Sequence, residues 1–563
     1  MLFAHPLAWA LSFLSSLRTQ DRSPSHLITT KVQQFAQDLL VNGSLPGMTL
    51  AVVHPDGTVE TAGFGIKTEL GQSMTADTLF GIASCSKAFL ASSFGILIDD
   101  FANGRNATPL PDGVSRLDWR TKVKDVLPDD WKLMDDFTTD MADFRDILSH
   151  QSGFPRHEFS YQPTDTLLDV IRRQRLLRPA FELRQRYHYI NQMYMVASHV
   201  ISVYSGMPYM EFVKKRIWEP LNMTSTTFSE NEASGDGLLT QSWTASGRRI
   251  PFWFPDRTAH LMAGPAAIIS NVHDLSKWVR ALLNGGVDPL TNITIVPATT
   301  LSEQRSTQIV MDLAPAFPDA SLAGYTYGWV RESFQGHEVL SHPGAVPGFS
   351  DEILLLPSQK LGIIALGNAD SKQPQELAVS YRIIEDYLGL PRSASIQFAS
   401  LPSAGDIPIP DPVAGSIPLE EYAGRYSSPG YPTLMLCDPH HPEAQCEDIL
   451  KVYSALEDVT ATTSTLYFEL PSVWVSHGRL RREEENNFQF TATYLFPQGY
   501  GQNATAFETD VSPLTLAAAK FAVDEGKVTG FGLFGLVGEK TERQRNGGTL
   551  EETAEVWFEK TPW

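Results

Sequence analysis

Residues 79–99 read LFGIASCSKAFLASSFGILID, an apolar, strand-like run that leads directly into a helical stretch. Ser84 and Lys87 stand three residues apart where the helical stretch begins, so both side chains lie on one face, one turn apart. A serine hydroxyl is a poor nucleophile unaided, and a nearby amine can accept its proton or tune another base that does so. This context predicts a catalytic pair, with Cys85 between them as a small buried hydrophobe.

Two further short motifs follow along the chain, Tyr189-Ile190-Asn191 and His342-Pro343-Gly344. Alone, each has an ordinary structural explanation, a packed tyrosine beside a polar turn and a hydrogen-bonded histidine. The chain contains no G-x-S-x-G and no H-E-x-x-H, so the sequence does not support an α/β-hydrolase or a zincin as an alternative enzyme class.

In this order, S-x-x-K, Y-x-N and H-x-G resemble the motifs of the serine hydrolases that include class C β-lactamases, penicillin-binding proteins, D-aminopeptidases and related esterases. The flanking segments FRDILSHQSGFP (144–155) and HPGAVPGFSDEILLLP (342–357) also resemble that family. The resemblance covers about residues 30–395. It implies an α+β, β-lactamase/transpeptidase-like fold with an antiparallel sheet, flanking helices and a helical subdomain, and it implies no cofactor and no metal.

The family resemblance also implies roles for these residues. Lys87, as a cation, would lower the pKa of the Tyr189 phenol from its ordinary value of about 10. Tyr189 would then take the proton from Ser84, which forms an acyl-enzyme with an amide or ester substrate. Asn191 would hold the substrate amide and orient Lys87, and the backbone amides of Ser84 and Ala345 would bind the oxyanion.

One departure from the family bears on the substrate. Penicillin-recognising members mostly carry Lys-Thr-Gly where this chain has His342, Pro343 and Gly344. A lysine offers a fixed positive charge to a substrate carboxylate, whereas a histidine is mostly neutral at pH 7. We therefore expect a peptidase-like or esterase-like enzyme with weak β-lactamase activity, and an acyltransferase is the alternative that the sequence leaves open.

Periodicity predicts mixed secondary structure before residue 398. The expected helices are 27–40, 84–99, 193–204 and 272–284, and the expected strands are 48–54, 58–62, 327–331, 338–341, 352–357 and 362–366. Strands at both ends of this region around a helical middle favour an α+β layout for a hydrolase domain spanning 26–398.

A stretch rich in proline, SLPSAGDIPIPDPVAGSIP (400–418), predicts a linker, which we place at 399–417. Short β-rich runs with turn residues between them follow, at 432–436, 449–454, 464–470, 472–476, 488–496, 528–536 and 554–560. They predict a small all-β barrel over 418–563. This region resembles the lipocalin-like domain that some members of the family carry.

Compartment and partners follow from composition. Residues 1–20 are mostly apolar and have the character of a signal peptide, although no Lys or Arg precedes the apolar run. The alternative is an apolar N-terminal helix that packs on the body of the protein. Acceptor sites for N-glycosylation favour a secreted glycoprotein over a cytoplasmic one; they are Asn42, Asn106, Asn222, Asn292 and Asn503. The net charge of −21 argues against a nucleic-acid partner, and no stretch is long enough to span a membrane. We expect a small-molecule or peptide substrate and leave a homo-oligomer open.

Cys437 and Cys446 stand close together in the turn-rich segment CDPHHPEAQC. In a secreted protein this spacing predicts a local disulfide. The alternative is a zinc site made of Cys437, His440, His441 and Cys446, but the spacing matches no common zinc finger.

Overall fold

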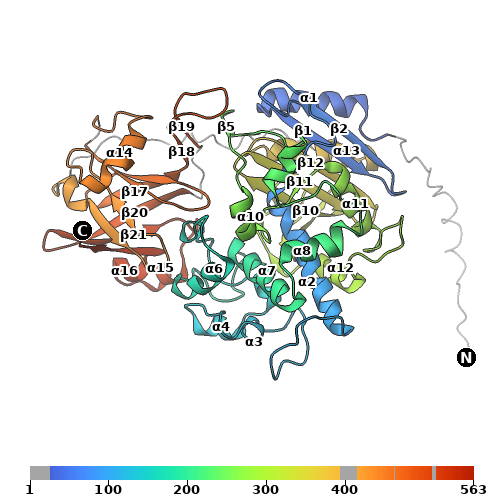
Figure 1. Cartoon of the computed structure of the whole chain (residues 1–563), viewed down its shortest axis with the longest axis horizontal. Coiled ribbons are helices and arrows are strands. Elements are labelled where there is room, and N and C mark those ends of the chain that lie inside the picture. Colours follow the sequence, from blue (N-terminus) through green and yellow to red (C-terminus); the bar gives the residue numbers. More distant parts are fainter. Residues whose placement is uncertain (1–25, 394–414, 462, 510–514, 563) are drawn as a thin grey trace, which may run out of the picture.

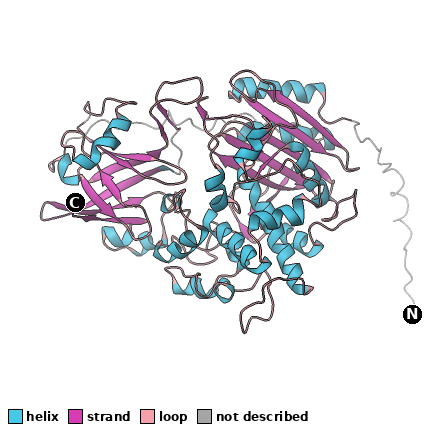
Figure 2. Ribbon diagram, viewed as in Figure 1, coloured by secondary structure: helices cyan, strands magenta, loops and turns pink. Residues whose placement is uncertain are grey.

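The computed structural model describes residues 26–393, 415–461, 463–509 and 515–562. The expected signal peptide (1–20) and most of the expected linker (399–417) lie outside these residues. Within the described residues the longer strands form two eight-stranded antiparallel sheets, and Figures 1 and 2 show them side by side with helices and loops between them.

The first sheet has the strand order β2-β1-β12-β11-β10-β9-β8-β7. The hairpin of β1 and β2 therefore pairs through β12 with strands that come some 300 residues later in the chain. The strands are β1 Gly47–Val53, β2 Val59–Gly65, β7 Ile309–Val310, β8 Gly324–Tyr325, β9 Val330–Phe334, β10 His337–Val346, β11 Phe349–Leu356 and β12 Leu361–Gly367.

Both faces of this sheet are covered by helices, which is why every residue of β1, β11 and β12 is buried. Leu50 and Val52 point to one face, against α1 and α13, while Ala51 and Val53 point to the other, against α2 and α11. The helices are α1 Thr30–Gly43, α2 Ser86–Ala102, α3 Val123–Val126, α4 Asp136–Met141, α5 Phe144–Leu148, α6 Leu167–Arg173, α7 Asn191–Ser205, α8 Tyr209–Val213, α9 Glu230–Gly235, α10 Asp256–Met262, α11 Val272–Leu283, α12 Ala298–Arg305 and α13 Gln373–Leu388. The α+β prediction is confirmed.

Several element boundaries differ from the prediction for physical reasons. The first helix starts three residues later than expected, because Thr29 caps it by accepting a hydrogen bond from the Val32 amide. The predicted strand 327–331 is mostly a turn, since Gly328 adopts φ +75° where a side chain would collide with Lys87 and Ala88, and β9 begins only at Val330. The predicted strand 338–341 extends to Val346, so the whole H-P-G motif lies within β10.

The second sheet lies in the C-terminal region and has the order β14-β13-β22-β21-β20-β17-β16-β15. Its two edge strands meet where the Cys437 and Tyr467 backbones exchange two hydrogen bonds, of 2.8 and 3.0 Å, so the sheet is nearly closed. The strands are β13 Gly424–Ser427, β14 Leu434–Leu436, β15 Thr465–Glu469, β16 His477–Arg482, β17 Asn487–Thr493, β20 Leu516–Asp524, β21 Lys527–Phe534 and β22 Val556–Thr561.

Aromatic side chains fill the inside of this barrel. Phe531 packs against Tyr426, Phe521 and Phe558 with ring centroids 5.0–5.2 Å apart. At the closing edge, Cys437 and Cys446 form the predicted disulfide. Because both sulfurs are bonded to each other, the alternative zinc site with His440 and His441 lacks its two thiolate ligands.

The C-terminal region is not all-β, and two predicted strands are wrong. Residues 449–454 belong to the helix α14 Glu447–Tyr453, because Ile449, Leu450 and Tyr453 bury one helical face and acidic residues occupy the first turn. Residues 472–476 form a turn in which the Ser472 hydroxyl accepts hydrogen bonds from the Trp474 and Val475 amides. Strands β16 and β20 and the short helices α15 Glu542–Asn546 and α16 Leu550–Thr553 were not predicted.

The two regions share side chains across their boundary. Phe159, from the first region, belongs to the hydrophobic cluster inside the barrel and lies 5.8 Å from Phe490. Conversely, the core cluster of the first region includes three residues of the C-terminal region, Val473, Phe496 and Phe507. Figure 1 shows the C-terminal sheet beside α6 and α10. Among the described residues, no helix combines the length and the apolar character that crossing a membrane requires.

Candidate active site

Ser84 stands on a single 3₁₀ turn, Ala83–Cys85, that leads into α2 at Ser86. The turn is strained, because Ala83 is a buried non-glycine residue with φ +44°. Cys85 is buried and directs its thiol to the His342 carbonyl oxygen at 3.1 Å, as expected for a packed cysteine. The turn therefore fixes the Ser84 hydroxyl between the helix and β10.

The three motif residues Ser84, Lys87 and Tyr189 meet in space. The Ser84 Oγ lies 2.7 Å from the Tyr189 hydroxyl and 3.1 Å from the Lys87 Nζ. Tyr189 precedes α7, so the contact spans 105 residues of sequence. The S-x-x-K and Y-x-N segments thus form one hydrogen-bonded cluster.

Lys87 is completely buried, and its amine has three neighbouring oxygens. Besides Ser84, the Nζ donates to Asn191 Oδ1 at 2.8 Å and to the Pro265 carbonyl oxygen at 2.9 Å. Burial, helped by the Arg156 charge, holds the pKa of Lys87 well below its usual range.

The surroundings of Tyr189 shift its pKa in opposite directions. Burial raises the pKa of Tyr189 above its ordinary value, and the opposing influence comes chiefly from the Arg156 guanidinium, 4.6 Å from the ring centroid. The family resemblance gives Lys87 the role of lowering this pKa as a cation, whereas burial favours the neutral amine and the protonated phenol.

His342 is buried rather than open to a substrate. Its Nε2 lies 3.0 Å from the Tyr325 hydroxyl and its Nδ1 lies 2.8 Å from the Pro343 carbonyl oxygen. Burial lowers the pKa of His342 to about 3, so the ring is neutral at working pH. Gly344 is buried beside Asp351, where a β-carbon would collide, and Ala345 is exposed on β10.

Sequence reasoning missed residues that complete the site. Arg156 and Glu158 lie on the loop after the SGFP segment, and Glu158 Oε1 accepts a hydrogen bond from Asn191 Nδ2 at 3.0 Å. No short motif marks either residue; the loop's position after SGFP is the available signal. His150 is buried and accepts a hydrogen bond from the Ile190 amide at 3.1 Å.

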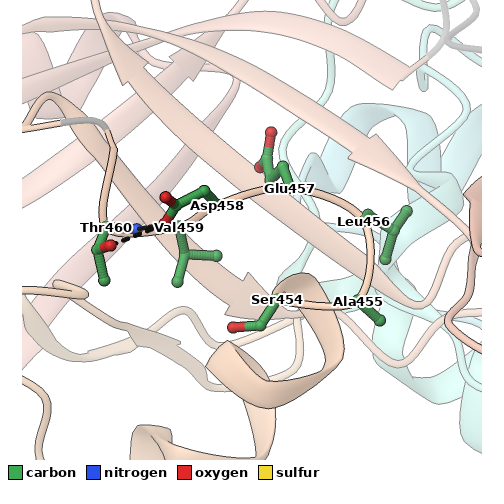
Figure 3. A pocket seen from close by; sticks show the side chains of 7 residues that line it. All are labelled: Ser454, Ala455, Leu456, Glu457, Asp458, Val459 and Thr460. Atoms are coloured by element: carbon green, nitrogen blue, oxygen red, sulfur yellow. Dashed lines mark hydrogen bonds between the residues drawn. The ribbon is translucent and has the colours of Figure 1, made fainter.

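A surface hollow of about 460 Å³ lies elsewhere, on the loop after α14 (Figure 3). It is lined by Ser454 to Thr460, and the Asp458 carboxylate there accepts hydrogen bonds from the amide and hydroxyl of Thr460. None of the motif residues lines it, and its second acid, Glu457, lies 3.6 Å from both Arg479 and Arg481, so we do not regard it as a catalytic site.

Comparison with known proteins places the region that holds these residues in a known family. The family described as "Beta-lactamase" matches residues 31–387, well over half of the chain. The chain belongs to the Beta-lactamase family. All the motif residues fall within the matched range, which ends before the C-terminal barrel.

Two fungal relatives extend the similarity. "Unguisins hydrolase ungD" of Aspergillus violaceofuscus is 30% identical over 70% of this chain and 73% of its own length. "Unguisins hydrolase ungD'" of Aspergillus campestris is 29% identical over 72% of this chain and 77% of its own length. Hydrolases are therefore among the relatives of this chain.

Solved structures show the shared fold. The octameric penicillin-binding protein homologue from Pyrococcus abyssi superposes with a TM-score of 0.54 at 18% identity, over 94% of this chain and 99% of that one. The D-amino acid amidase from Ochrobactrum anthropi SV3 superposes with a TM-score of 0.51 at 21% identity, over 64% of this chain and 99% of its own. The first likeness spans nearly the whole chain, whereas the second covers 64% of it.

Proposed function

We propose that this protein is a serine hydrolase that forms an acyl-enzyme on Ser84 and cleaves amide or ester bonds. One observation carries the proposal: the Ser84 hydroxyl lies within hydrogen-bond distance of both a buried amine, Lys87, and a half-buried phenol, Tyr189. A buried lysine costs free energy, so it is expected where its chemistry is used.

In this mechanism Lys87 is the base that activates Ser84. A neutral amine has two N–H groups and one lone pair, and the carbonyl oxygens of Asn191 and Pro265 are fixed acceptors for the two N–H groups. The lone pair is then directed at the third neighbour, the Ser84 hydroxyl. Ser84 attacks the substrate carbonyl carbon while its proton moves to Lys87.

Tyr189 acts as the acid in the same step. As a protonated phenol next to Ser84, it gives its proton to the leaving amine or alcohol when the tetrahedral intermediate collapses, and the resulting phenoxide then takes back the proton held by Lys87. We place the oxyanion at the backbone amides of Ser84 and Ala345. Water attacks the acyl-enzyme in the reverse sequence of proton transfers, unless another acceptor replaces it.

The relatives favour an amide substrate. Two are named hydrolases of unguisins, and one structural neighbour is a D-amino acid amidase. Because His342 is buried and neutral, it offers no charge to a substrate carboxylate. We therefore propose uncharged amides and esters as substrates, with β-lactams hydrolysed weakly.

Intact mass spectrometry tests the proposal. The protein is incubated with activated acyl esters, D- and L-amino acid amides and a penicillin, and the expected result is an acyl adduct that maps to Ser84. Ser84→Ala should form no adduct and lose turnover by at least about 10³-fold. Turnover by Ser84→Ala at the wild-type rate would contradict the assignment, and products formed with added alcohols or amines would identify acyl transfer.

The disulfide also bears on the compartment. Disulfides persist in oxidising environments, so the Cys437–Cys446 bond supports our proposal that the protein is secreted. N-terminal sequencing and glycopeptide mapping of protein from the native host's medium would test it, and intact, unglycosylated protein confined to the cytoplasm would contradict it.

A further inference from the structure

We infer that Trp474, a residue of the C-terminal region, positions the catalytic amine of Lys87 through a chain of hydrogen bonds. The chain runs from Trp474 through Tyr161, Glu158 and Asn191 to Lys87. This inference rests on the proposed function and deepens it, because it gives the C-terminal region a part in the chemistry of the site.

Each bond of the chain has a defined donor. The Trp474 Nε1 donates to the Tyr161 hydroxyl oxygen at 2.7 Å, and the Tyr161 hydroxyl donates to Glu158 Oε2. The Asn191 Nδ2 donates to Glu158 Oε1 at 3.0 Å, and Asn191 Oδ1 accepts from Lys87 Nζ at 2.8 Å. Four contacts therefore connect the indole to the amine.

The donor at the Trp474 end fixes the direction of every hydrogen bond in this series. An indole N–H can only donate, so the Tyr161 oxygen accepts from Trp474 and its own proton is free to point at Glu158. Glu158 then accepts on both oxygens, one bond from Tyr161 and one from Asn191. A carboxylate, which only accepts, satisfies both contacts, and the Arg156 guanidinium 3.9 Å away complements its charge.

The orientation of the Asn191 amide is the consequence that matters for catalysis. With its NH₂ group held by Glu158, Asn191 must present its oxygen to Lys87. A flipped amide would instead direct a donor at an amine that also donates. Because the Asn191 oxygen is one of the two acceptors that aim the Lys87 lone pair at Ser84, Glu158 and Trp474 are positioning residues for the base.

The loop that carries Glu158 is held by the C-terminal region at further points. His157 Nδ1 lies 2.5 Å from the Tyr431 hydroxyl, and Phe159 is inserted into the barrel core. The Val473 amide also donates to the Tyr161 carbonyl oxygen at 3.3 Å. The backbone of this loop should therefore stay in place when the Trp474 N–H alone is removed.

A pair of tryptophan variants tests the inference. Trp474→Phe removes the indole N–H and keeps an aromatic ring against Phe254, 5.6 Å away. Trp253→Phe is the matched control: Trp253 packs against Tyr494 at the same boundary, and its indole N–H has no hydrogen-bond partner among the described residues. Both variants are assayed for the rate of Ser84 labelling by a fluorophosphonate probe, for kcat and KM on an activated ester, and for thermal unfolding.

We expect Trp474→Phe to lower the labelling rate and kcat by about 3- to 10-fold, the effect of one hydrogen bond, with KM changed less than about twofold. Trp253→Phe should leave all three values within about twofold. Equal labelling and kcat in both variants would overturn the inference, even if Trp474→Phe unfolds at a lower temperature. If wild-type protein shows no labelling that depends on Ser84, the proposed function fails, and the inference with it.

A double-mutant cycle separates positioning from packing. Tyr161→Phe breaks the next bond of the same chain, so adding it to Trp474→Phe should lower kcat by less than the product of the two single effects. Independent, multiplicative losses of kcat would show that Trp474 and Tyr161 act separately and would contradict a shared chain.

Discussion

The interiors of the two regions differ in chemistry. The barrel is filled with aromatic rings, such as Phe521, Phe531 and Phe558, that form edge and stacked contacts. The first region also has an apolar core, but it buries groups that a stable core normally avoids. They include the cation-forming Lys87, the imidazoles His150 and His342, and the carboxyls Asp351, Glu352 and Glu376.

Energetically unfavourable features are found in the first region, near the candidate active site. Neither carboxyl oxygen of the buried Asp351 has a hydrogen-bond partner among the described residues, and Ala83 has a strained backbone just before Ser84. In the barrel, packing is the dominant stabilising feature. We therefore expect polar substitutions in the first region to change activity, and truncations in the barrel to change stability.

The largest expected effect is on turnover. Tyr189→Phe keeps the ring and removes the proton, so kcat should fall by about 10²–10⁴-fold with little change in KM. Steady-state kinetics on an activated ester measure this. Tyr327→Phe is the control, because it also removes a tyrosine hydroxyl from the first region, and that hydroxyl has no partner among the described residues. Similar kcat values for the two variants would remove Tyr189 from the mechanism.

In the barrel the largest effect should be on unfolding. Phe531→Ala opens a cavity among three aromatic neighbours and should lower the free energy of unfolding by about 3–5 kcal/mol. Chemical denaturation followed by tryptophan fluorescence measures it. Phe534→Ala, on the same strand at a partly exposed position, should cost less than about 1 kcal/mol. Equal losses would show that the barrel interior is not tightly packed.

Opening the disulfide should destabilise the barrel by a smaller amount. Cys437 and Cys446 are nine positions apart in the sequence and lie where the edge strands meet. Loss of the disulfide should therefore lower the free energy of unfolding by about 2–3 kcal/mol. We expect reductant to lower the melting temperature of the wild type but not that of a Cys437→Ser, Cys446→Ser variant. If reductant lowers the melting temperature of both proteins equally, the change does not come from this disulfide.

The smallest effect concerns pH. Burial raises the pKa of Glu352 to about 8, against an ordinary value of about 4.5. The folded state then holds a proton that the unfolded state releases, so Glu352 should make stability fall as pH rises from about 4.5 to 8. Glu352→Gln keeps the shape and removes this titration.

The variant should be more stable than wild type at pH 8 and nearly equal to it at pH 4.5. Denaturation curves at both pH values measure the difference. A wild type that is more stable at pH 8 than the variant would mean that Glu352 is ionised and partnered in the folded protein.

Prediction from sequence succeeded where the signal was local. The hairpin of β1 and β2 and the helix α11 lie within two or three residues of the predicted ranges, because alternation and helical periodicity report burial directly. Residues 449–454 were misassigned because a short apolar run fits a buried strand and a buried helical face equally well. Strand β16, HGRLRR, was missed because three arginines obscure its alternation.

The sequence by itself determined the identity and order of the reactive groups. Ser84 and Lys87 share a helical turn whatever the rest of the chain does, and the order of the three motifs placed the chain in its family. Only the tertiary structure decided their protonation and their partners. The pKa of Lys87 depends on burial by distant segments. The hydrogen bond between Trp474 and Tyr161 joins two residues that are 313 positions apart in the sequence. Desolvation and hydrogen-bond direction arise from packing in three dimensions, and no local pattern in the chain encodes them.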